Sequence, residues 1–188
     1  MSRFSDRSVR ELYAQAGSTA AVPGGGVVTA LSAMLGVALV QKAVHMTLRH
    51  QEHAELHAAA PVLDELASAF EADAEADAAA FADFIAAGQL PKTTPDETAA
   101  RRARLDHAAA GAAHAALGAL QHARAAVRVT RRIRRFVTAT MAPDITAGLR
   151  LLHVARRNAI DNARGNLEAM SPGAEQTRLL ELLRRLAA

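Results

Sequence analysis

Residues 20–42, AAVPGGGVVTALSAMLGVALVQK, decide the fold of this chain. Three glycines follow a proline, and an apolar run then continues without a charged residue until Lys42. Apolar residues on every side of a helix are typical of a helix that is buried among others. The run is shorter than the ~20 residues of a membrane span and is rich in small residues, so it predicts a central core helix over residues 27–49.

The segments around this run have helical patterns separated by clear breaks. Helices are predicted over residues 5–16, a long segment ending near residue 87, residues 95–131, residues 145–170 and a C-terminal segment that Ser171 and Pro172 cap. Pro61 either opens or kinks its helix, and Thr94 with Glu97 forms a capping-box signature after the break at residues 88–95. Residues 1–188 therefore predict an all-α fold, a single-domain bundle of about five or six helices that pairs as a homodimer.

The composition limits the classes of protein and of site. The absence of cysteine excludes disulfides, thiolate metal sites and a thiol nucleophile, and it fits a cytoplasmic location. The net charge is only +3, so the sequence pI of about 10.1 reflects the high pKa of arginine and argues weakly for nucleic acid. The polar N-terminal residues contain no apolar signal core.

Three asparagines form an unusual stripe on the helix predicted for residues 145–170. Asn158, Asn162 and Asn166 are spaced by four residues and share one helical face. Asparagine is a poor interior helix residue, so the stripe indicates a use for the amides. They form either a hydrogen-bonded seam to another helix or the lining of a polar ligand site.

Aspartates occur in two contexts. Asp73 and Asp77 lie one turn apart, and a solvated acidic face is the favoured interpretation of Asp73. Asp77 lies one turn before Phe81, where a raised pKa would suit a general acid or base. Asp144 follows Pro143 at a helix start, where capping is the expected role.

Basic residues form two further clusters. The histidines lack an HExxH pattern, so they are interpreted as surface residues rather than as a metal site: His45, His50, His53 and His57. Five arginines form a stripe that either holds phosphates or a polyanionic tail or is a solvated face paired with acids: Arg124, Arg128, Arg131, Arg132 and Arg135. No aromatic residues are interleaved, which disfavours single-stranded nucleic acid.

The glycines lack the GK[ST] of a phosphate loop and the preceding strand of a dinucleotide fold. Exposed N–H groups before a helix suit an anion or a developing oxyanion, and close helix packing is the alternative.

Ordered landmarks resemble one known family. They are PGGG at residues 23–26, HMT at 45–47, DAAAF at 77–81, LPK at 90–92, Asp144, and NARGN at 162–166. This set, within residues 4–170, resembles the cyclodeaminase/cyclohydrolase family, which comprises the C-terminal domain of formiminotransferase-cyclodeaminase and stand-alone methenyltetrahydrofolate cyclohydrolases.

The resemblance implies an all-helical homodimer that acts on a one-carbon tetrahydrofolate without a metal or other cofactor. It either hydrolyses 5,10-methenyl-tetrahydrofolate to 10-formyl-tetrahydrofolate, which the stand-alone length favours, or releases ammonia from 5-formimino-tetrahydrofolate. The alternative is a catalytically altered helical dimer that binds a folate or another anion. No nucleic acid or membrane partner is expected.

The resemblance also implies roles for individual residues. Proton transfer is assigned to Asp77 or Asp144. Lys42, where the family has methionine, either reaches solvent from the helix flank or adds a catalytic or anion-binding group. The residues expected to contact substrate are Pro23, Gly24, Gly25, Gly26, Phe81, Asn162, Asn166 and Arg131.

Overall fold

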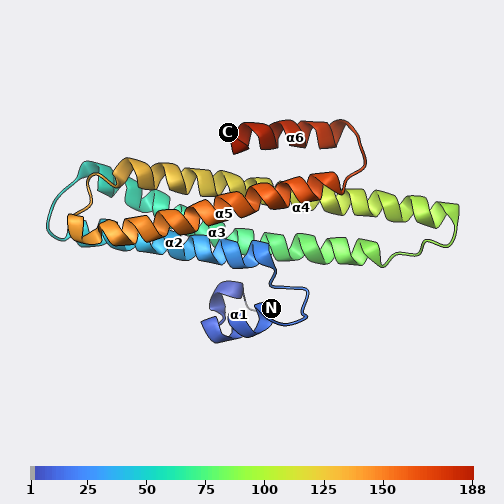
Figure 1. Ribbon diagram of the computed structural model, residues 1–188, viewed down its shortest axis with the longest axis horizontal. Helices are drawn as coiled ribbons and strands as arrows, with labels where there is room; N and C mark the ends of the chain where they lie inside the picture. Colours follow the sequence, from blue (N-terminus) through green and yellow to red (C-terminus); the bar gives the residue numbers. More distant parts are fainter. Residues whose placement is uncertain (1–2) are drawn as a thin grey trace.

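The computed structural model describes residues 3–188 and contains no strand in this range, which confirms the all-α prediction. Six α-helices and two short 3-10 segments make up the fold (Figure 1). Their bounds are η1 Phe4–Asp6, α1 Val9–Ala16, α2 Gly25–Leu48, α3 Ala54–Gly88, α4 Pro95–Ile133, η2 Ala139–Met141, α5 Ala142–Glu168 and α6 Ala174–Ala187.

Four long helices form the bundle. α2 packs against α3 and α5, and α4 packs against the same two helices from the other side. α6 lies across α4 and α5, whereas α1 lies on the opposite side of the bundle in Figure 1. The arrangement is one single helical bundle, as the periodicity of the sequence predicts.

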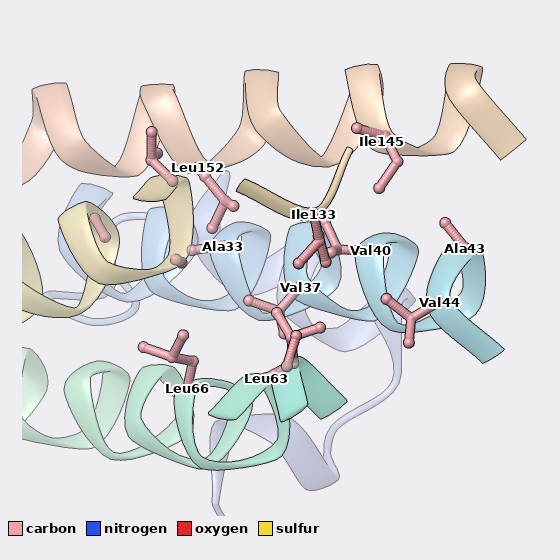
Figure 2. Close-up of a cluster of buried hydrophobic side chains, with 14 of the residues drawn as sticks. Ala33, Val37, Val40, Ala43, Val44, Leu63, Leu66, Ile133, Ile145 and Leu152 are labelled. Carbon is pink, nitrogen blue, oxygen red and sulfur yellow. The ribbon is translucent and has the colours of Figure 1, made fainter. Parts of the chain in front are cut away.

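α2 supplies much of the core. Ten of its residues are buried, and Figure 2 shows Val37 pointing toward Leu63 of α3 in a cluster that also contains Leu152 of α5. By length and composition α2 could also cross a membrane, and half of its most apolar window is buried inside the bundle. It is packed here as the core helix of a helical domain.

α2 and α5 cross in backbone contact at two glycines. A Cβ atom on Gly148 would lie 2.7 Å from the carbonyl oxygen of Gly36 and 2.9 Å from Cγ2 of Val40. A Cβ atom on Gly36 would lie 3.1 Å from the carbonyl oxygen of Gly148. Because no side chain separates the two backbones, this contact sets the register of α5 on α2.

The N-terminal helix is shorter than predicted. Residues 5–16 divide into η1 and α1 because Ser8 begins a helix of its own. Its hydroxyl accepts a hydrogen bond from the Glu11 N–H at 3.2 Å, and the Glu11 carboxylate accepts one from the Ser8 N–H at 2.7 Å. The same reciprocal pair forms between Thr94 and Glu97, which confirms the capping box predicted there.

Three other predicted boundaries change. Pro61 lies inside α3 and does not open it. α5 begins at Ala142, three residues before the predicted start at residue 145, because a proline in the first turn needs no intrahelical N–H partner. Gly173, not Ser171, is the N-cap of α6. The Ser171 hydroxyl accepts a hydrogen bond from Nε of Arg102 at 2.9 Å instead of one from the first turn of α6.

Candidate functional site

A cleft lined by apolar side chains and a few polar ones opens where the glycine segment enters α2. It has a volume of about 950 Å³, its mouth included, and it lies between the start of α2 and the facing parts of α3, α4 and α5. A narrower recess, of which only about 30 Å³ is open to a water-sized group, continues from it between the same four helices. The two share Gly26, Asp77 and Asn162, so these residues lie at their junction.

Asp77 sits directly against the backbone of Gly26. A Cβ atom at position 26 would overlap the Oδ1, Cγ and Oδ2 atoms of Asp77, so only glycine leaves room for the carboxylate. The backbone N–H of Val27 donates to this carboxylate. Burial raises the pKa of Asp77 above its ordinary value and outweighs the opposing effect of that hydrogen bond.

The glycine segment forms the wall of the cleft, as the sequence predicts. Gly24 is the N-cap of α2 and supplies no side chain to its first N–H groups. Gly24, Gly25 and Gly26 all line the cleft, whereas Pro23 is buried behind it. The first turn therefore offers backbone donors and the positive end of a helix to the cleft.

The asparagine stripe serves both of the uses considered for it. Asn158 donates to the Thr29 hydroxyl at 2.8 Å, and that hydroxyl donates to the Gly25 carbonyl at 2.8 Å. This is the seam between α5 and α2. Asn162 and Asn166 line the cleft instead, and Phe81, with 43% of its surface exposed, lies among their neighbours.

Asp73 and His122 form an ion pair beside Asp77 that sequence reasoning missed. Nδ1 of His122 lies 2.9 Å from Oδ2 of Asp73, whose side chain is only 10% exposed and lines the narrow recess. The hydrogen bond that His122 donates to Asp73 raises the pKa of His122, against the effect of burial. The ring of Phe70 meets the His122 ring edge-on. The prediction of a solvated acidic face is therefore wrong for Asp73.

The neighbouring glutamates of α3 also have partners. Glu75 accepts a hydrogen bond from the Phe4 N–H at 2.6 Å, and Glu71 accepts one from the Ser5 hydroxyl. Together they attach the N-terminal segment to α3.

Two predicted catalytic residues lie elsewhere in the chain. Nζ of Lys42 is 3.1 Å from Oδ2 of Asp144, and both belong to the far ends of α2 and α5. Asp144 precedes Asn162 by 18 residues of one helix, which corresponds to about 27 Å. Within one chain, neither Lys42 nor Asp144 reaches the cleft.

Arg131, predicted to contact substrate, also lies outside the cleft. Its Nη2 is 3.2 Å from Nε2 of His153, in a separate recess between α4 and α5. Among residues 3–188, no three histidine, aspartate or glutamate side chains gather closely enough to hold a metal ion.

The fold and the cleft together define a class: an all-helical domain with a half-buried carboxylate and two amides around a cavity large enough for a small organic molecule. The family model for formiminotransferase-cyclodeaminase matches residues 8–184. The chain belongs to this family, whose members work in tetrahydrofolate one-carbon metabolism, as the sequence landmarks predict.

Individual relatives extend this comparison. The formimidoyltransferase-cyclodeaminases of Rattus norvegicus and Mus musculus are each 36% identical to this chain over 103 residues, 49% of it and 18% of their own length. A crystal structure of formiminotetrahydrofolate cyclodeaminase from Thermotoga maritima superimposes with a TM-score of 0.83 at 18% identity. It covers 97% of this chain and 89% of that one, so the whole bundle shares its fold.

Proposed function

We propose that the cleft binds a one-carbon tetrahydrofolate and rearranges its bridging carbon, with Asp77 as the proton-transfer group. The main observation behind this proposal is the environment of the Asp77 carboxylate. It has no cationic partner among residues 3–188, and it is desolvated between Gly26 and the cavity that Asn162 and Asn166 line. Because the pKa of such a carboxyl group is raised toward neutral pH, the group can both accept a proton and return it. Family membership supports the substrate class.

In the hydrolysis of 5,10-methenyl-tetrahydrofolate, a water oxygen bonds to the bridging carbon while Asp77 takes up one water proton. The same carboxyl group then gives that proton to N5 as the bond from carbon to N5 breaks. The second water proton leaves to solvent as the formyl group forms on N10. The negative carboxylate also stabilises the positive charge that the methenyl bridge carries in the ground state.

In the cyclodeamination of 5-formimino-tetrahydrofolate, the same group would serve a related step. N10 attacks the carbon of the protonated formimino group (–CH=NH2+), and Asp77 accepts the N10 proton. The same carboxyl group then returns this proton to the amino nitrogen, whose bond to the carbon breaks to release ammonia and leave the positively charged 5,10-methenyl bridge. Asn162 and Asn166 supply donors and acceptors for the edge of the pterin, and Phe81 supplies an apolar face for its ring. The chemistry consists of proton transfers, so we propose no metal or redox cofactor.

Two assays separate these reactions. Purified protein is incubated with 5,10-methenyl-tetrahydrofolate, and the loss of its absorbance is compared with the spontaneous rate; ammonia release from 5-formimino-tetrahydrofolate is measured in parallel. We expect turnover of one of them in the wild type and a loss of at least ~100-fold in Asp77→Asn. Tetrahydrofolate binding by calorimetry without turnover in either assay would favour the altered, non-catalytic dimer.

We also propose the homodimer, because an apolar surface on α1 and α2 has no cover within the chain. Val9 and Tyr13 of α1 are 82% and 81% exposed, and no residue of that helix is buried. Val28 and Leu35 of α2 are 41% and 57% exposed and line a groove with them. A second copy would bury this surface and stabilise α1.

A two-fold axis near Leu35 would also give Lys42 and Asp144 a role. Val28, Leu35 and Lys42 are spaced by seven residues along one face of α2. Antiparallel pairing of the two α2 helices would therefore place Lys42 of the partner subunit opposite Val28, which lies one turn from Gly25. Because Lys42 pairs with Asp144 of its own chain, Asp144 of the partner subunit would then lie close to the cleft. Each cleft would then combine Asp77 of one subunit with Asp144 of the other.

Mixed dimers test this arrangement. Asp77→Asn and Asp144→Asn chains are unfolded together, refolded and assayed. Half of the dimers formed at random are mixed, and each has one intact composite cleft, so we expect about a quarter of the wild-type activity from two nearly inactive parents. Absence of recovery would show that the two aspartates do not act across the subunits.

A cytoplasmic location remains a prediction from the cysteine-free sequence.

A further inference from the structure

A second recess, separate from the cleft, contains four arginines among its seven lining residues. It lies between α4 and α5 beside the end of α6 and has a volume of about 760 Å³, its mouth included. Its polar lining residues are Arg124, Arg128, Arg131, His153 and Arg156. Nothing in the proposed one-carbon chemistry uses this recess.

Backbone carbonyls at the end of α6 hold two of these arginines in place. Nη1 of Arg124 donates to the Arg185 carbonyl at 3.0 Å and to the Leu186 carbonyl, and Nη2 of Arg156 donates to the Ala187 carbonyl at 2.6 Å. The last carbonyls of a helix lack intrahelical partners, so they are available for this purpose. A guanidinium has five N–H donors, and these contacts leave most of them for a ligand.

Within residues 3–188, no carboxylate forms an ion pair with any of the four arginines of this recess. The interpretation as an acid-paired face is therefore wrong for Arg124, Arg128 and Arg131. Burial and the charges of Arg131 and Arg156 lower the pKa of His153, which keeps its imidazole neutral and able to accept the contact from Arg131 at 3.2 Å. Four like charges held around one recess are relieved by an anion.

We propose that this recess is a binding site for a multiply charged oxyanion of the pyrophosphate type, either free or as part of a nucleotide. Planar guanidinium groups bind phosphate oxygens in pairs, and a charge of several units matches four arginines better than a single carboxylate does. α4 contributes Arg124 and Arg128 on one side, and α5 contributes Arg156 on the other. The site does not depend on the proposed activity of the cleft.

Calorimetric titration with inorganic pyrophosphate tests the proposal. Arg128→Gln and Arg156→Gln should each raise the Kd about tenfold, since one charge-assisted contact is lost. Arg132→Gln is the matched control, because Arg132 is exposed on the same helix and does not line the recess. Thermal melts of all variants identify any loss of folding, and the exposed Arg128 keeps the test valid if Arg156→Gln unfolds.

Further ligands distinguish the sources of the anion. ADP that binds more tightly than pyrophosphate, with the same sensitivity to Arg128→Gln, would identify a nucleotide site, and equal affinity would identify a site that reads phosphate alone. The proposal is overturned if pyrophosphate at about 10 mM, a concentration that detects even millimolar affinity, gives no binding heat. It is also overturned if Arg132→Gln weakens binding as much as Arg128→Gln, as a general duplex-DNA surface along the stripe would require.

Discussion

Replacement of Gly26 by alanine should inactivate the cleft without removing any chemical group. The new Cβ atom would overlap the Asp77 carboxylate, and real Cβ contacts essentially never fall below 3.0 Å. The carboxylate must therefore move by about 1 Å, and a displacement of this size at a reacting group costs on the order of 100-fold in rate. This loss equals about 2.7 kcal/mol of transition-state stabilisation.

The assay is kcat/KM with 5,10-methenyl-tetrahydrofolate or 5-formimino-tetrahydrofolate, whichever the wild type converts. Gly25→Ala is the matched control, since its Cβ would meet Asn158 at an ordinary 3.8 Å. It makes the same chemical change one residue earlier in the wall of the cleft without touching Asp77, so we expect a much smaller loss of activity than in Gly26→Ala and a melting temperature that is the same or higher.

Full activity in folded Gly26→Ala would refute the reasoning, because it would show that the reaction does not depend on the position of the Asp77 carboxylate against Gly26. An equal loss in Gly25→Ala and Gly26→Ala would also refute it. That result would attribute the loss to the conformation of the glycine segment rather than to the carboxylate.

Three other predictions concern stability. Asp77→Asn should stabilise the fold at pH 7. Because the pKa of Asp77 is higher in the folded chain than in the unfolded chain, the wild-type fold loses stability as the pH rises from the ordinary pKa of aspartate through the raised pKa. Urea unfolding should therefore show that the substitution adds more stability at pH 7 than at pH 4. The pKa of His122 is also raised in the folded chain, so the stability that its protonated form adds is present below about pH 6.5 and is lost as the pH rises through the raised pKa. Asp73→Asn should remove this difference in stability between pH 6 and pH 8. If the variant kept the difference, the ion pair would be contradicted. Gly148→Ala should destabilise the bundle by about 1–3 kcal/mol through overlap with Gly36 and Val40. In contrast, Gly118→Ala meets nothing within 4 Å and should stabilise it by about 0.5–1 kcal/mol in the same melts.

The sequence predicted the parts of this molecule that depend on local patterns. Helical periodicity and the Thr94 capping box are local, and the four-residue spacing of Asn162 and Asn166 already places both amides on one face. Gly26 and Asp77 belong to two landmarks of the family resemblance, but their contact, and with it the reason for glycine at position 26, became clear only from the structure.

Contacts between distant segments could not be predicted in the same way. Asp73 and His122 are 49 residues apart on different helices, and neither belongs to a motif. The ion pair of Lys42 with Asp144 likewise depends on how α2 and α5 cross. Helical periodicity describes one helix at a time, so it carries no information about the register between two of them.

The glycine crossing of α2 and α5 constrains, during evolution, the number of residues between the crossing and the cleft on each helix. Each residue inserted or deleted between Gly26 and Gly36 would turn Gly26 by about 100° around the helix axis relative to the crossing. The glycine would then no longer face Asp77, although the altered helix would remain apolar on all sides and could still pack. Relatives that keep this cleft should therefore vary freely in loop length but align without gaps over residues 26–36, and the same should hold on α5 between residues 148 and 162.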